Sequence, residues 1–165
     1  MTARADFIEK FGGVFEHSPF IAERGYDAGL MLVPLTAKGV HAAFVSIFRK
    51  ASREERLGVL RAHPDLAGRL AIAGALTEDS KKEQAGAGLD RLSPQEHARF
   101  TELNAAYTEK FGFPFIIAVK GLNKDDILAA FEQRIDNSVE EEFATAAAQV
   151  ERIALLRLQS LLPET

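Results

Sequence analysis

Helix start and stop signals recur along this sequence and constrain its fold more than any other feature. Ser93-Pro94-Gln95-Glu96 combines an N-cap serine, a proline at the first helical position and a glutamate three residues after the serine. Apolar side chains then follow at helical spacing, and Gly112 supplies a stop after Phe100, Leu103, Tyr107 and Phe111. The pattern predicts a long amphipathic helix that ends close to residue 112.

Two further segments repeat this capping pattern. The helix after Ser52-Arg53-Glu54-Glu55 should end at or near His63, because Pro64 disfavours helical geometry in the residue before it. Ser138-Val139-Glu140-Glu141 begins the longest predicted helix, which Pro163 ends. Its expected apolar stripe consists of Val139, Phe143, Ala146, Ala147, Val150, Ile153, Ala154 and Leu161.

The remaining signals complete an all-α prediction. Helices are expected at residues 36–51, 77–87 and 123–136, whereas the short apolar run 115–119 fits a helix or a strand equally well. We interpret that run as a buried connecting segment. No repeat, low-complexity tract or polar linker divides the chain, so we predict one domain over residues 1–165, a bundle of about seven to nine helices.

Composition limits the possible partners and the location. The 165 residues are 47% hydrophobic with a formal charge of −4, and the basic residues are scattered, so neither nucleic acid nor a membrane surface is an expected partner. A small molecule is the expected ligand. The absence of cysteine excludes disulfides, thiol nucleophiles and cysteine-ligated metals. Without a signal peptide or a membrane-spanning run, we expect a cytoplasmic protein.

Two polar clusters are candidates for chemistry. His63 lies where a capped helix meets Pro64, which suits a positioned acid or base, although such a histidine often only binds a helix-end carbonyl. Ser80, Glu83 and Gln84 share a helical face that could orient and protonate a polar heterocycle. The alternative for this second cluster is a solvated helix with a surface ion pair.

Two arginines lie on apolar helix faces and need an explanation. Arg157 falls on the stripe of the last helix, and Arg134 lies seven residues after Ile127. A buried guanidinium must reach water, pair with a carboxylate or face an anionic ligand. The pattern favours an internal ion pair slightly over substrate binding for both.

Other common sites lack the required spacing. The four histidines are far apart and form no His-Glu-x-x-His pair, so no metal site is expected. Gly86-Ala87-Gly88 lacks the lysine and third glycine of a nucleotide-binding loop, and no serine-hydrolase elbow is present.

Several segments taken together resemble one family across almost the whole chain. They are Phe11-Gly12-Gly13-Val14-Phe15-Glu16-His17-Ser18-Pro19, His63-Pro64-Asp65-Leu66-Ala67-Gly68, Ser80-x-x-Glu83-Gln84, Phe111-Gly112-Phe113-Pro114-Phe115 and Leu156-Arg157-Leu158. In this order they resemble the decarboxylases of 2-oxo-4-hydroxy-4-carboxy-5-ureidoimidazoline (OHCU), which form (S)-allantoin at the end of urate breakdown. The resemblance implies an all-helical single domain, usually a homodimer.

The resemblance also implies roles for individual residues. His63 corresponds to the catalytic histidine and Glu83 to its carboxylate partner. Residues implied to contact the substrate are Pro64, Ser80, Gln84, Phe115, Ile116, Ile117, Ala118, Val119 and Arg157, with Arg134 as the alternative to Arg157.

The implied chemistry needs no cofactor. The carbon that carries the carboxylate adjoins a C=N bond in the implied substrate, so this bond accepts the electrons released with carbon dioxide. A hydroxyisourate hydrolase is the expected neighbour in the pathway. Two other readings fit the residues: a non-catalytic helical binding module, which would be inactive on OHCU, and a metal-dependent hydrolase of a ureido compound, which a chelator would inhibit.

Overall fold

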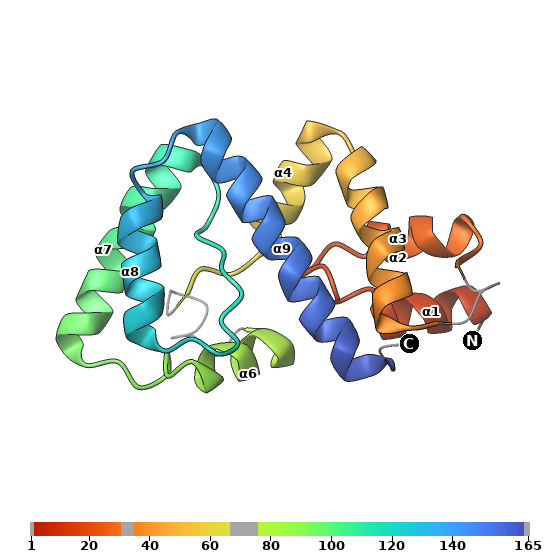
Figure 1. Ribbon diagram of the computed structural model, residues 1–165, viewed down its shortest axis with the longest axis horizontal. Coiled ribbons are helices and arrows are strands. Elements are labelled where there is room, and N and C mark those ends of the chain that lie inside the picture. The colour runs from red at the N-terminus through yellow and green to blue at the C-terminus, as the bar shows by residue number, and fades with distance from the viewer. Residues whose placement is uncertain (1, 31–34, 67–75, 164–165) are drawn as a thin grey trace. The chain divides into compact units, whose positions relative to one another are not determined.

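A computed structural model describes residues 2–30, 35–66 and 76–163 of the chain. These residues form eight α-helices and no strand, which confirms the all-α prediction (Figure 1). The helices are α1 (Ala3–Phe11), α2 (Phe20–Asp27), α3 (Ala37–Lys50), α4 (Arg53–Ala62), α6 (Glu78–Gly86), α7 (Pro94–Phe111), α8 (Lys124–Arg134) and α9 (Val139–Leu161). None of these helices is long and apolar enough to cross a membrane.

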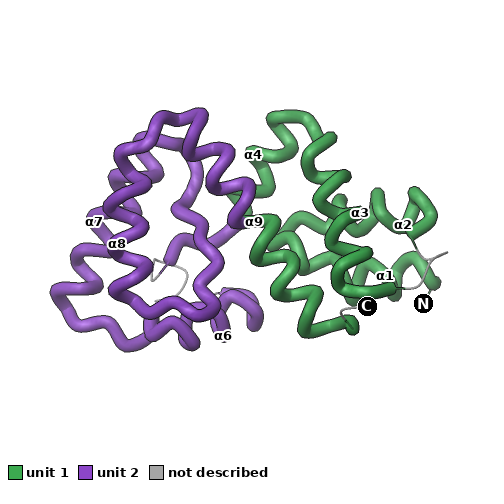
Figure 2. The backbone as a smooth tube through the Cα atoms, viewed as in Figure 1, with its two compact units in different colours: residues 1–62, 150–165 green, residues 63–149 purple. Residues whose placement is uncertain are grey.

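The helices form two compact units, which Figure 2 shows in different colours. Unit 1 contains residues 1–62 and 150–165, and unit 2 contains residues 63–149. The boundary at residues 149 and 150 falls within α9, so one helix contributes its first part to unit 2 and its second part to unit 1.

Phenylalanine rings fill the core of unit 1. Phe44 of α3 is fully buried and contacts the rings of Phe7, Phe11 and Phe15 edge-on. Phe15 also lies 5.4 Å from Phe48, centroid to centroid. The glycine-containing segment after α1 therefore packs its aromatic side chains against α3, and such aromatic pairs stabilise a core beyond their burial alone.

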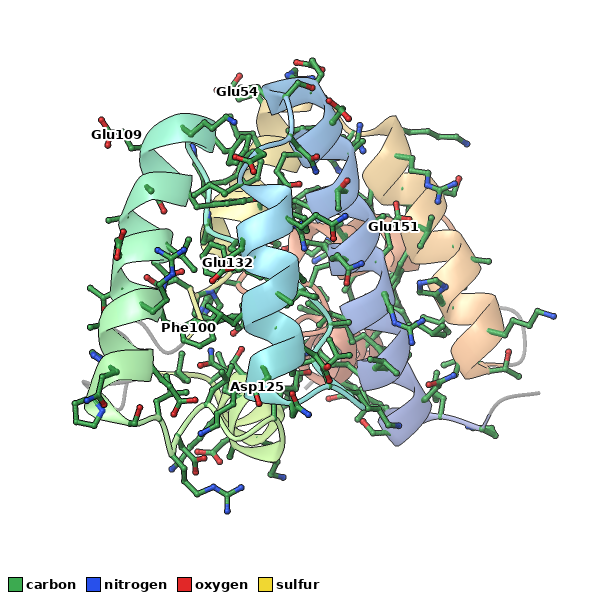
Figure 3. All side chains as sticks on the ribbon, turned by 60° about the vertical axis from the view of Figure 1, so that its left-hand side comes forward. Glu54, Phe100, Glu109, Asp125, Glu132 and Glu151 are labelled. Carbon is green, nitrogen blue, oxygen red and sulfur yellow. The ribbon has the colours of Figure 1, made fainter. Side chains whose placement is uncertain are left out.

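A second aromatic cluster forms the core of unit 2, where α7 packs against α8. Phe115 stacks on Phe131 of α8 at 4.0 Å, and Tyr107 of α7 contacts both rings. Phe100, labelled in Figure 3, meets Phe131 from the other end of α7. All four residues of the stripe predicted for α7, Phe100, Leu103, Tyr107 and Phe111, are buried.

The predicted helix ends agree with the structure. Ser93 and Glu96 form a reciprocal capping box at the start of α7, and Gly112 ends the helix with a left-handed φ of 79°. Helix α4 ends at Ala62, directly before His63, as Pro64 predicts. Residues 115–119 form neither helix nor strand and are largely buried, which confirms the connecting segment.

Two features differ from the prediction. Helices α1 and α2 were not among the helices expected from the sequence. The predicted stripe of α9 is wrong at both ends, since Val139 and Leu161 are 45% and 42% exposed. End turns of a helix have packed neighbours on one side only, so apolar spacing overstates burial there.

The capping box of α7 gives a test of local stability. We expect Ser93→Ala to lower the free energy of unfolding by about 1 kcal/mol, because it removes the acceptor for the N–H of Glu96. Urea unfolding followed by circular dichroism measures the change. Thr101→Ala, an exposed hydroxyl deletion within the same helix, is the matched control and should not destabilise. Equal losses in both variants would contradict the role of the cap.

Candidate active site

His63 opens unit 2 at the broken end of α4. It follows Ala62, the last residue of the helix, and only 7% of its surface is exposed. The next residues, Pro64 and Asp65, continue without regular structure. The imidazole is therefore held in the interior rather than on a smooth helical surface, as an acid or base that must be positioned requires.

The second predicted cluster lies on α6, in the same unit. Ser80 and Gln84, one turn apart, are 4% and 6% exposed, and Glu83 is half-buried between them and the solvent. Lys81 and Lys82 are exposed on the opposite side. The face that the sequence singled out thus points inward, and α6 is not a uniformly solvated helix.

Hydrogen bonds to the main chain bring α6 and α7 to the segment after His63. The Gln84 side-chain N–H donates to the carbonyl of Asp65 at 3.3 Å, and the Asn104 side-chain N–H donates to the carbonyl of Leu66 at 2.9 Å. The structure therefore unites the histidine segment with the Ser80, Glu83 and Gln84 face within one unit.

Asn104 was missed by the sequence analysis. It is 7% exposed and lies on the apolar stripe of α7, four residues after Phe100 and three before Tyr107. A polar residue at such a position has to find a hydrogen-bond partner. A polar residue on an apolar helix face is the same signal that identified Arg134 and Arg157, and it could have identified Asn104.

The predicted substrate-contacting run at residues 115–119 is fixed by its main chain. The Ile116 carbonyl accepts a hydrogen bond of 2.8 Å from Arg134 Nη1, and the Ala118 N–H donates to Gln149 Oε1 at 2.9 Å. These residues belong to unit 2, as His63 and α6 do. Unit 2 therefore contains every predicted site residue except Arg157.

Arg134 forms an internal ion pair rather than lying free for a ligand. Its Nη2 lies 2.7 Å from Glu142 Oε2, and the same carboxylate accepts hydrogen bonds from Tyr107 and from Asn137. The guanidinium also lies 4.3 Å from the centre of the Phe115 ring. Burial and the neighbouring carboxylate of Glu142 both raise the pKa of Tyr107, so its hydroxyl remains a donor.

Arg157 forms a comparable pair in unit 1. Its Nη2 lies 2.8 Å from Glu16 Oε2, and its Nη1 donates to the Gly13 carbonyl at 3.1 Å. Both charged residues are at most 5% exposed. The ion pair favoured by the apolar pattern is confirmed for both arginines.

Among the residues described, no three histidine, aspartate or glutamate side chains gather as metal ligands. The two residues that end the histidine motif, Ala67 and Gly68, lie outside the described residues.

Comparison with known proteins decides the family. The family model for OHCU decarboxylase matches residues 1–159. The chain belongs to this family. A Haloferax volcanii relative named as the decarboxylase of 2-oxo-4-hydroxy-4-carboxy-5-ureidoimidazoline is 44% identical over 153 residues, 92% of this chain and 86% of its own length. A mouse relative of the same name is 34% identical over 95% of this chain and 86% of its own length. The protein is therefore a decarboxylase, as the resemblance implied.

Solved structures agree with this assignment. A crystal structure of (S)-allantoin synthase superimposes with a TM-score of 0.76 at 34% identity, over 96% of this chain and half of that chain. A structure of OHCU decarboxylase in the presence of (S)-allantoin gives a TM-score of 0.74 at 25% identity, over 92% of this chain and 96% of that one. A Bacillus subtilis bifunctional protein of uric acid degradation is 38% identical, and this chain spans 30% of its length.

The buried pair in unit 1 supplies a prediction. Glu16→Gln should destabilise the protein by on the order of 3 kcal/mol, because it leaves the Arg157 charge buried without its carboxylate. The urea unfolding midpoint measures this loss. Glu9→Gln, the same change at an exposed position of α1, should have little effect. Indistinguishable midpoints for the two variants would show that the pair contributes nothing.

Proposed function

We propose that this protein decarboxylates OHCU to (S)-allantoin and that His63 and Glu83 perform the proton transfers. The names of the relatives, decarboxylase of OHCU and (S)-allantoin synthase, support the substrate and the product. The single observation that supports the site is the hydrogen bond from Gln84 to the Asp65 carbonyl. This bond links the helix that carries Glu83 to the segment that follows His63.

The substrate supplies its own electron sink in this reaction. The bond between the ring carbon and its carboxylate breaks, and carbon dioxide leaves. The bonding electrons form a C=C bond to the neighbouring carbon, while the electrons of the adjacent C=N bond move to the ring nitrogen, which takes up a proton. An enol-like intermediate results, and its hydroxyl loses a proton while the neighbouring carbon gains one. The enzyme has to hold the carboxylate, exchange these protons and deliver one of them to a single face.

Each proposed residue takes one of these tasks. His63 exchanges protons with the substrate, because an imidazole can both accept and donate near neutral pH. Glu83 orients the imidazole or a ring nitrogen. Pro64, Ser80 and Gln84 border the heterocycle, and the main chain of residues 115–119 lies against it.

The arginine that binds an anionic or carbonyl group of the substrate is Arg157 in this proposal. Its carboxylate partner Glu16 holds the guanidinium in one orientation. Arg134 is the weaker choice, because Glu142 and the Ile116 carbonyl already occupy both edges of its guanidinium.

The proposal extends to the cellular setting. The protein acts in the cytoplasm as a homodimer and receives OHCU from a hydroxyisourate hydrolase. The Bacillus relatives named as bifunctional proteins of uric acid degradation support a close link between successive steps of that pathway.

The test generates OHCU in the cuvette from urate, with urate oxidase and hydroxyisourate hydrolase, and follows the product by circular dichroism. The wild-type protein should produce the (S) enantiomer, whereas spontaneous decay produces a racemate. His63→Ala should lower turnover at least about 100-fold, because positioned acid-base groups contribute that much or more.

Two controls make this result specific. His97→Ala removes a half-buried imidazole from α7 and should leave turnover unchanged. The far-ultraviolet spectrum of His63→Ala should match that of the wild type. Undiminished formation of (S)-allantoin by His63→Ala would refute the assignment of the histidine, and a racemic product from the wild type would refute the function.

A further inference from the structure

The segment 115–119 is an unusual piece of protein interior, because it is buried without belonging to a helix or a strand. Figure 1 shows it running back beside α7 and α8 between the end of one and the start of the other. Buried main-chain groups normally require hydrogen-bond partners. The hydrogen-bond partners of this segment therefore indicate its role.

Two side chains from different helices hold the segment at alternate residues. Arg134 of α8 donates to the Ile116 carbonyl at 2.8 Å, and Gln149 of α9 accepts from the Ala118 N–H at 2.9 Å. Ile117 lies between the two anchored residues, and neither anchor reaches its N–H or C=O.

Within the described part of the chain, no hydrogen bond reaches the N–H or the C=O of Ile117. Ile117 is also more exposed than Ile116 and Ala118 on either side of it. A donor and an acceptor held side by side on one residue form two parallel hydrogen bonds with a planar amide or ureido group, as neighbouring strands do.

We propose that Gln149, together with Arg134, is a positioning residue that fixes this main chain so that Ile117 can bind the ureido or ring amide group of the substrate. This inference rests on the proposed function for the identity of the substrate. Gln149 itself touches the segment and not the reacting atoms.

The surroundings of the two anchors make Gln149 the better position for a test. Arg134 is tied to the buried carboxylate of Glu142 and lies against the Phe115 ring, so its removal would disturb the core of unit 2. Gln149 is half-buried and makes a neutral hydrogen bond. Its replacement therefore loosens one anchor and leaves no buried charge behind.

The experiment compares three variants by calorimetric binding of (S)-allantoin, a stable compound that contains both a ureido group and ring amides. Gln149→Leu removes the acceptor and keeps the size of the side chain, so we expect the Kd to rise about five-fold, the factor expected from one typical hydrogen bond. Gln149→Glu retains an acceptor and should bind like the wild type. Gln133→Leu makes the same apolar change at an exposed position of α8 and should have no effect.

Turnover gives a second readout that a merely structural role would not produce. We expect Gln149→Leu to raise KM for OHCU about as much as it raises the Kd, with kcat nearly unchanged. This result would show that the lost interaction stabilises the bound substrate and the transition state equally. A wild-type Kd for Gln149→Leu, or failure of Gln149→Glu to restore binding, would overturn the proposal.

Hydrogen exchange separates this inference from the function on which it rests. The amide of Ala118 should exchange faster in Gln149→Leu than in the wild type and Gln149→Glu, whether or not the protein acts on OHCU. An inactive wild-type protein would refute the proposed function. Unchanged exchange at Ala118 would refute the anchor.

Discussion

The carboxylate of Glu142 organises unit 2. It is completely buried on α9, and donors from three directions reach it: Tyr107 of α7, Arg134 of α8 and Asn137 of the connection after α8. A buried carboxylate is costly unless several donors satisfy it, so each donor must keep its place for the others to remain favourable. The network thereby fixes the first part of α9 against α7 and α8. Through the other edge of Arg134, it also fixes the carbonyl of Ile116.

Unit 1 contains a smaller arrangement of the same kind. Glu16 is 1% exposed and pairs with Arg157 of α9, which also donates to the carbonyl of Gly13. Glu151, labelled in Figure 3, makes a second link from α9, because it binds Arg49 of α3 through both carboxylate oxygens. Helix α9 therefore contributes charged side chains as well as apolar ones to the interior of each unit.

Local chemistry explains what the sequence predicted well. Caps such as Ser93 and stops such as Pro64 act within four residues, so the sequence alone determines where α7 starts and where α4 ends. The inward face of α6 followed from helical spacing. The pattern also indicated that Arg134 and Arg157 need partners.

The identity of those partners depended on the fold. Glu16 lies 141 residues before Arg157 in the chain, and nothing in the local pattern links the two. The Asn104 hydrogen bond to Leu66 and the Gln149 hydrogen bond to Ala118 likewise join segments that only tertiary packing brings together. Helices α1 and α2, which the sequence analysis did not predict, pack against each other, and α2 also packs against α3.

A buried segment without regular structure suits a reaction in which the protein mainly orients the substrate. When the substrate accepts its own electrons, the protein contributes mainly by holding one face of a flat heterocycle in a fixed relation to an acid or base. Main-chain donors and acceptors do this well, because a fixed peptide group loses no side-chain rotamer freedom when it binds. A regular helix would have consumed these groups internally. Residues 115–119 avoid that loss while Arg134 and Gln149 anchor alternate residues, and Ile117 keeps its main-chain groups available.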